Sequence, residues 1–183
     1  MGLQPTTTRP SAPDHPRHDL SPRAVRAVMA SLALVLLAAS LDSTAVGTAL
    51  PRIVTDLASN DLYTWVFTIY LLTMTASMPI FGSISDRSGR KPVLFAGMLI
   101  VVGGSILCGL AGEMWQLIVF RGLQGIGAGA IVPVTLAIIG DLYAPAERAR
   151  VQALFGSLFV LAFLIGPTLG GIFTDTIGWR WVF

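Results

Sequence analysis

Five long apolar stretches alternate with short polar connections along this chain. They are residues 27–50, 62–84, 92–112, 114–139 and 151–173. Each reaches the roughly 20 residues that an α-helix needs to cross a ~30 Å hydrocarbon core. Backbone amides inside lipid must be hydrogen-bonded within their own segment, so these stretches must be helical despite their many valines, isoleucines and glycines. The pattern predicts an all-α membrane protein with five spans and a sixth that starts at about residue 179.

The composition excludes an ordinary soluble domain. Hydrophobic residues make up 54% of the 183, charged residues make up 12%, and the mean hydropathy is +0.73. The charged side chains gather between the apolar stretches, whereas a soluble fold would spread them over a polar surface. Although the net charge is +2, the arginines line no face of a polar domain, so nucleic acid is not an expected partner.

No pattern in the chain indicates catalysis, a cofactor or a metal site. Cys108 is the single cysteine and lies in an apolar stretch, which excludes a disulfide framework. His15 and His18 fall in the polar amino-terminal segment, where solvated side chains are expected rather than metal ligands. The glycines near residue 125 also fit a dinucleotide-binding pattern, but no strand–helix alternation surrounds them and helix packing is favoured. The chain is therefore not expected to be an enzyme.

The connections between the apolar stretches predict the topology. Residues 1–26 carry five prolines and four arginines, a composition typical of a disordered tail. With this tail inside, nine basic residues lie on the cytoplasmic side and two, Arg52 and Arg180, lie outside, as the positive-inside rule requires. We therefore expect a multi-pass cell-membrane protein with a cytoplasmic amino terminus. A cleavable signal peptide is the alternative, but the first apolar stretch continues to Leu50 and reaches full spanning length.

Two formally charged side chains lie inside the five stretches, Asp42 in the first and Arg121 in the fourth. Counting along helices that run in opposite directions places both about 10–12 Å below the outer surface. An isolated charge costs at least ~2.5 kcal/mol at the middle of a bilayer, so the two are expected to pair or to face a wet cavity. A buried carboxylate beside an arginine can exchange protons, which makes the pair a candidate for proton coupling. A purely structural ion pair is the alternative.

The connection between the second and third stretches, residues 82–92, carries a dense motif. Gly82 would permit close helix approach, Gly89 suits a reversal with positive φ, and Pro92 suits the first turn of a helix. Asp86 is a carboxylate at a helix C-terminus, where the helix dipole disfavours a negative charge unless a cation or the N-terminus of another helix lies close to it. A partner is therefore expected. A hairpin that only sets topology would explain the basic residues but not the aspartate.

This connection resembles the signature Gly-x-Leu-x-Asp-Arg-x-Gly-Arg-Lys of the major facilitator superfamily, with Ile84 at the leucine position. The resemblance implies a partial amino-terminal helical bundle of such a transporter, whose two halves rock about a cavity at the membrane midplane. It also implies that the loop acts as a gate by contacting the second half of the molecule. The residues that take this gating role are Gly82, Asp86, Arg87, Gly89, Arg90 and Lys91.

Further segments are similar to motifs of the same superfamily, particularly of its fourteen-helix drug/proton antiporter branch. Residues 41–51 resemble the first-helix pattern Leu-Asp-x-Thr-Val-Val-Asn-Val-Ala-Leu-Pro, with Gly47 replacing the asparagine and removing a polar group. Residues 121–128 resemble the fourth-helix motif, whose arginine is assigned to proton coupling. Residues 166–171 resemble a fifth-helix motif associated with exporters, and residues 178–183 the start of helix six.

These resemblances assign a role to each candidate site residue. Asp42 and Arg121 take the proton-coupling role, and Thr44 and Gln124 are expected in the substrate cavity. A third group is expected to pack or bend the helices. Its members are Gly125, Gly127, Gly166, Pro167, Gly170 and Gly171.

The function that the resemblance implies is proton-coupled export of small amphipathic or cationic compounds, as in multidrug efflux. The expected partners are the lipid bilayer, protons, the small-molecule substrate and a carboxy-terminal half that this chain lacks. Two alternatives stay open. One is a non-transporting membrane fragment or assembly partner, and the other is a facilitator-type uptake carrier with the same fold, whose transport would not depend on a pH gradient.

Overall fold

The computed structural model describes residues 21–57 and 62–183 and consists, within these ranges, of helices without strands. Five of the helices are long and apolar enough to cross a membrane, which confirms the predicted all-α membrane fold. The elements are α1 (Pro22–Asp56), α2 (Tyr63–Ser88), α3 (Arg90–Gly109), α4 (Met114–Leu142), α5 (Pro145–Thr176) and the 3-10 helix η1 (Trp179–Val182).

Each helix extends beyond its apolar stretch at one end or both, because helix ends can remain helical outside the hydrocarbon, although α3 ends at Gly109, short of the predicted residue 112. α1 already begins at Pro22, and the Ser21 hydroxyl caps it by accepting a hydrogen bond from the Ala24 amide at 3.3 Å. Residues 22–26, assigned above to the tail, are therefore helical, and residues 1–20 of that tail lie outside the described residues. The predicted start of a sixth span takes the form of the four-residue helix η1.

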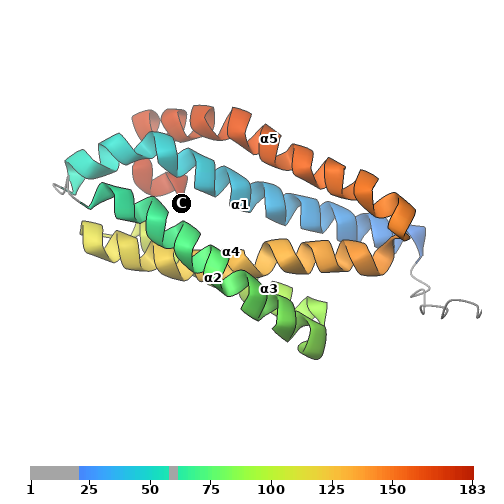
Figure 1. Cartoon of the computed structure of the whole chain (residues 1–183). Helices are drawn as coiled ribbons and strands as arrows, with labels where there is room; N and C mark the ends of the chain where they lie inside the picture. Colours follow the sequence, from blue (N-terminus) through green and yellow to red (C-terminus); the bar gives the residue numbers. More distant parts are fainter. Residues whose placement is uncertain (1–20, 58–61) are drawn as a thin grey trace, which may run out of the picture.

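The helices alternate in direction between two chemically different ends (Figure 1). We call the end that carries Arg23, Arg87, Arg90, Lys91 and Arg148 the basic end, and the end that carries Tyr63, Trp65, Trp115, Trp179 and Trp181 the aromatic end. α1, α3 and α5 run from the basic end to the aromatic end, and α2 and α4 run back. α1 and α5 therefore lie side by side and parallel, although they are far apart in the sequence.

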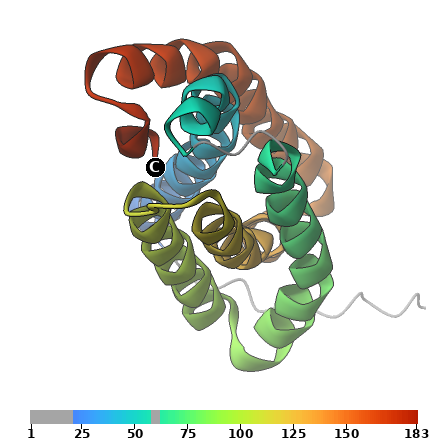
Figure 2. The ribbon, with the colours of Figure 1, turned by 90° about the vertical axis from the view of Figure 1, so that its left-hand side faces the viewer.

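α4 is the central helix of the bundle. Figure 2, viewed from the aromatic end, shows α4 between α2 and α3, with α1 and α5 along a third side. In its most apolar stretch 61% of the residues are buried, against 11–22% in the other four helices. The side chains of α4 therefore meet every other helix, whereas the outer helices expose apolar side chains such as Leu99 and Leu164.

Small residues bring α2 and α3 into backbone contact with α4. A Cβ added at Gly125 would lie 2.5 Å from the Tyr70 carbonyl oxygen, and one at Gly127 would lie 2.7 Å from the Gly97 carbonyl oxygen. The Ser77 hydroxyl bridges α2 to α4 by donating to the Ile126 carbonyl at 3.2 Å. The predicted packing role of Gly125 and Gly127 is thus visible as direct contact between helix backbones.

α1 and α5 are joined in the same way. A Cβ at Gly166 would lie 2.8 Å from the Thr44 Cβ, and one at Gly170 would lie 2.9 Å from the Ala45 Cα. The Thr44 hydroxyl also donates to the Ala162 carbonyl of α5 at 3.1 Å. Close glycine contact and an interhelical hydrogen bond therefore hold the two parallel helices together.

Two glycines do not make the close approach expected of them. A Cβ at Gly82 or at Gly171 would meet nothing within 4 Å among the described residues. Neither position packs against another helix within residues 21–57 and 62–183, so a packing role for these two glycines stays a prediction. Pro167 lies inside α5, next to the closely packed Gly166.

Candidate functional site

An ion pair joins the two helices that carry the buried charges. Arg121 Nη1 of α4 lies 2.9 Å from Asp42 Oδ2 of α1. The arginine side chain is fully buried and the aspartate side chain is 14% exposed. The predicted pairing of these residues is therefore confirmed, and it places a desolvated carboxylate and its counter-ion in the interior of the bundle.

Gln124 completes a polar network around this pair. Its Oε1 accepts a hydrogen bond from Arg121 Nη1 at 2.6 Å, and its Nε2 donates to Asp42 Oδ1 at 3.1 Å. The same amide nitrogen donates to the Ser105 hydroxyl of α3 at 2.7 Å. Arg121 and Gln124 share a face of α4 because they are three residues apart. Both oxygens of the Asp42 carboxylate thus accept a hydrogen bond, and the network links α1, α3 and α4.

Glycine again determines this local geometry. A Cβ at Gly104 of α3 would lie 2.8 Å from the Gln124 Cβ and 3.0 Å from its Cα. This position therefore tolerates no side chain unless α3 moves away from α4. The close approach brings Ser105, the next residue, within hydrogen-bonding distance of Gln124.

Aromatic rings cover the rest of the guanidinium. The Arg121 Cζ lies 4.4 Å from the centroid of the Tyr70 ring and 5.5 Å from that of Phe183. Its Nε and Nη2 are buried and have no hydrogen-bond partner among the described residues. Attraction between a cation and the face of an aromatic ring is strongest where water is excluded, so these rings stabilise a charge that the hydrogen bonds satisfy only in part.

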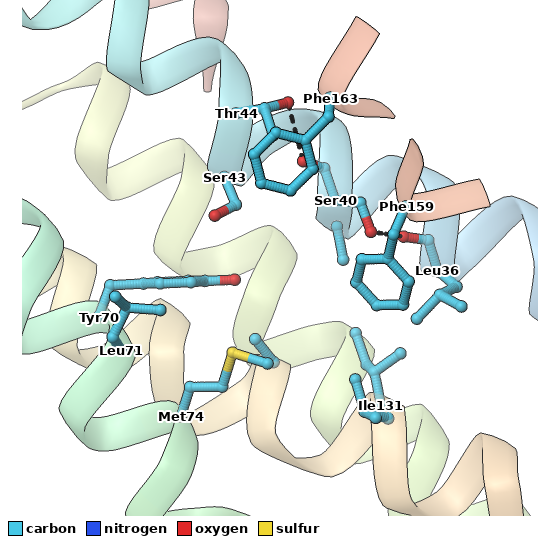
Figure 3. A pocket seen from close by; sticks show the side chains of 13 residues that line it. Leu36, Ser40, Ser43, Thr44, Tyr70, Leu71, Met74, Ile131, Phe159 and Phe163 are labelled. Carbon is cyan, nitrogen blue, oxygen red and sulfur yellow. Dashed lines mark hydrogen bonds between the residues drawn. The ribbon is translucent and has the colours of Figure 1, made fainter. Parts of the chain in front are cut away.

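A cavity of about 230 Å³ lies beside this network, between α1, α2, α4 and α5 (Figure 3). Three hydroxyl side chains of α1 and the aromatic rings of α2 and α5 face it, and none of its lining residues is formally charged. Two of those hydroxyls are already used as donors. Ser40 donates to the Leu36 carbonyl at 2.7 Å, and Thr44 shares its one proton between the Ser40 carbonyl at 3.0 Å and the Ala162 carbonyl at 3.1 Å. The lining residues are Leu36, Ala39, Ser40, Ser43, Thr44, Tyr70, Leu71, Met74, Ala128, Ile131, Val132, Phe159 and Phe163.

Of the two residues that were expected to line the substrate cavity, only one lines this cavity. Thr44 does line it, but Gln124 is fully buried in the polar network and is absent from the lining. Asp42 is absent from this lining as well, and instead borders a second cavity of about 240 Å³ with Gly166 and Phe173 of α5 and with Val182. The substrate role of Thr44 and Gln124 stays a prediction.

A second charged cluster lies at the basic end. Gly89, with φ of 92°, makes the tight reversal between α2 and α3, and this confirms the positive φ expected there. Arg90 forms an ion pair with Asp86 and donates to the Ser85 hydroxyl at 2.9 Å, so the partner expected for Asp86 is present. The Nε of the same arginine lies 3.1 Å from Asp141 Oδ2 at the end of α4.

The other basic residues of this connection are placed differently. Arg87 and Lys91 are exposed and form no ion pair within residues 21–57 and 62–183. Arg148 of α5 instead donates to the Gly140 carbonyl at 2.6 Å and to the Tyr143 carbonyl at 3.0 Å. It thereby satisfies carbonyl groups at the end of α4, where a cation is favoured.

Three residues of these sites were not anticipated from the sequence. Tyr70 and Ser105 are uncharged members of apolar stretches, and no periodic signal distinguishes them from packing residues. Asp141 could have been found, because it is an isolated acid next to a connection rich in basic residues. The depth of such groups follows from counting residues, but their neighbours depend on how each helix is rotated about its axis.

Comparison with known proteins agrees with this architecture. Residues 32–183 match the family model described as Major Facilitator Superfamily. Over 156 residues the chain is 44% identical to Multidrug transporter protein MdtP and 45% identical to Multidrug resistance protein 3, both of Bacillus subtilis (strain 168). The aligned part is 85% of this chain but 29% and 30% of those proteins, so the chain spans under a third of their length.

A solved structure shows the same fold. It is a bacterial homolog of the human lysosomal transporter Spinster, in an inward-facing and occupied conformation. The match has a TM-score of 0.69 at 20% identity and covers 90% of this chain and 38% of that chain. Since the family model spans most of the sequence and the helices superpose on such a transporter, this multi-pass membrane chain belongs to the Major Facilitator Superfamily.

Proposed function

We propose that this chain forms part of a proton-coupled exporter of small amphipathic or cationic compounds, located in the cell membrane with its amino terminus in the cytoplasm. The observation that carries the proposal is the buried Asp42–Arg121 pair beside an uncharged, aromatic cavity. The names of the two Bacillus subtilis relatives, a multidrug transporter and a multidrug resistance protein, support the same substrate class. The excess of basic residues at the basic end supports the orientation.

The cavity lining supports the substrate class. Phe159 and Phe163 of α5 present rings opposite Tyr70 of α2, and Met74 adds an adaptable apolar surface. Ring faces attract organic cations without requiring a carboxylate, and apolar walls suit lipophilic compounds of varied shape. The rest of the polypeptide would complete the binding site from the other side, as expected of a transporter built from two halves.

The ion pair supports proton coupling. When the Asp42 carboxylate takes up one proton, the net charge of the pair changes from zero to +1 and Arg121 loses its counter-ion. A buried charge without a partner is strongly unfavourable, so protonation would favour a different arrangement of α1 against α4. Substrate release coupled to proton uptake would follow if that arrangement bound the substrate less tightly.

The charged cluster at the basic end supports a gating role. Arg90 holds Asp86 of α2 and Asp141 of α4 together, whereas Arg87 and Lys91 remain exposed and available to another part of the polypeptide. In this proposal, the cluster stabilises one of the two arrangements of the transporter halves. The second half then either adds contacts to the cluster or competes for its charged groups. Gating would then depend on the exposed residues more than on the packed ones.

The decisive experiment measures drug export driven by a pH gradient in vesicles that contain the complete polypeptide. Asp42→Asn keeps the size of the side chain and removes the titrating group, so gradient-driven efflux should fall at least about tenfold. Asp175→Asn is the matched control, because Asp175 is an exposed acid at the end of α5 and should retain normal transport. Full gradient-driven efflux by Asp42→Asn would contradict the proton-binding role. Transport by the unmodified protein that ignores the gradient would instead indicate a facilitator-type carrier.

A further inference from the structure

Tyr70 belongs to both the polar network and the cavity. Its ring lies over the Arg121 guanidinium at 4.4 Å, and the same side chain lines the cavity. Figure 3 shows its hydroxyl pointing into the space between α1 and α2, towards Ser43. Tyr70 is 4% exposed, and its hydroxyl makes no hydrogen bond to another described residue. The Tyr70 side chain therefore contacts the Arg121 guanidinium and can also contact a ligand in the cavity.

The backbone of Tyr70 is held against α4. A Cβ at Gly125 would lie 2.5 Å from the Tyr70 carbonyl oxygen and 3.1 Å from its Cα, so α2 and α4 are in direct contact at this level. Gly125 follows Arg121 by one helical turn, which places the ring beside the guanidinium. With the backbone held, the ring can respond to a ligand only by rotating about its side-chain bonds.

The orientation of Arg121 depends on that ring. Its Nη1 is held by Asp42 and Gln124, whereas the buried Nε and Nη2 have no hydrogen-bond partner in the described part of the chain. Only one of the three guanidinium nitrogens thus has polar partners. The rings of Tyr70 and Phe183 complete the environment of the cation.

We propose that Tyr70 is a positioning residue that transmits occupancy of the cavity to the Asp42–Arg121 pair. A lipophilic, aromatic or cationic ligand that touches the phenol edge holds the ring against the guanidinium, and Arg121 then stays on the ionised Asp42. Without an occupant the ring loses that support, which weakens the pair and makes the carboxylate more available to a proton. This inference rests on the proposed function, because the ligand of the cavity is taken to be the substrate.

Nuclear magnetic resonance of the arginine side chains tests this directly. The complete polypeptide is labelled with 15N-arginine, placed in lipid nanodiscs, and titrated with tetraphenylphosphonium at constant pH. The Arg121 Nε–H signal is assigned by its loss in Arg121→Lys. Saturating probe should shift that signal in the unmodified protein and in Tyr70→Phe, which keeps the ring. In Tyr70→Leu the shift should fall at least about threefold, because the cation–ring contact is gone.

Phe163→Leu is the matched control, because it removes a ring of the same cavity that does not cover Arg121. It should weaken probe binding but leave the full shift at saturation. An unchanged shift in Tyr70→Leu, a lost shift in Tyr70→Phe, or no shift in the unmodified protein would overturn the inference. Should Tyr70→Leu fail to fold, Tyr70→Phe still decides whether the ring suffices. Failure of gradient-driven export in vesicles would count against the proposed function alone, since the shift at constant pH needs no gradient.

Discussion

Two arginine–aspartate sites in this chain have the same chemistry and opposite surroundings. Inside the bundle, the side chain of Arg121 is 0% exposed and that of Asp42 is 14% exposed. At the basic end, the side chain of Arg90 is 27% exposed, and its partners Asp86 and Asp141 are 65% and 55% exposed. Each arginine also has a hydrogen bond to an uncharged side chain, Gln124 in one case and Ser85 in the other.

Burial makes these similar sites behave differently. Removing one partner of a buried pair leaves an uncompensated charge and costs about 3–5 kcal/mol, whereas an exposed pair contributes about 0–1 kcal/mol and is screened by salt. Loss of the buried pair therefore has a large energetic effect, which the proposed proton coupling requires. The exposed cluster is suited to form and break readily during a conformational cycle.

The largest effect is expected from breaking the buried pair. Arg121→Leu leaves the Asp42 carboxylate without its cation and should lower the free energy of unfolding by about 3–5 kcal/mol. Asp42→Asn/Arg121→Leu removes both charges and should be at least about 1 kcal/mol more stable than Arg121→Leu alone. Thermal unfolding in detergent measures both. Additive losses would mean that the pair is not energetically coupled.

A smaller effect is expected from separating the helices that hold the buried site. Gly125→Ala places a Cβ against the Tyr70 carbonyl and should destabilise the protein by about 2–3 kcal/mol through overpacking. Gly171→Ala is the matched control, because it meets nothing within 4 Å and should be neutral or stabilising by up to about 1 kcal/mol. Equal effects of these two substitutions in an unfolding assay would show that α2 and α4 are not in close contact.

At the basic end, a glycine substitution should cost less because the surrounding chain is exposed and can relax. Gly89 has φ of 92° and ψ of 153°, a conformation that is costly for a residue with a Cβ. Gly89→Ala should therefore destabilise by about 1–2 kcal/mol. The substitution should also displace Arg90 from Asp86. Unfolding curves of Gly89→Ala, with Gly89→Asn as a second variant, measure the loss of stability. No loss of stability would indicate that the connection between α2 and α3 has a different backbone conformation in the membrane-embedded protein.

The smallest effect is expected from neutralising the exposed cluster. Asp141→Asn removes one partner of Arg90 and should change stability by less than about 0.5 kcal/mol, because both groups remain accessible to water. The difference should also shrink when salt is raised from low to high concentration. A loss as large as that of Arg121→Leu would remove the distinction between the two sites.

The membrane spans could be predicted because lipid permits few backbone conformations. Lipid forces every long apolar stretch into a helix, and the rise per residue fixes how deep each side chain lies. This reasoning placed Asp42 and Arg121 at one level, and the pairing confirms it. It was also enough to expect the reversal at Gly89.

The rotation of each helix about its axis could not be predicted in this way. Gln124 lies on the same face as Arg121 and is buried in the network, although the resemblance suggested a cavity position. Gly82 and Gly171 face open space, although the same small residue at Gly125 and Gly166 packs tightly. Which side of a helix meets a neighbour depends on contacts that are distant in sequence, and a single sequence carries no direct signal for them.

The contact between the parallel helices α1 and α5 links the buried pair to α5. Thr44 and two glycines of α5 hold these helices in direct contact. A change in the position of α1 at Asp42 would therefore displace α5 as well, although α5 carries none of the charged partners. Under the proposed coupling, one ionisation event at that carboxylate would act on two helices.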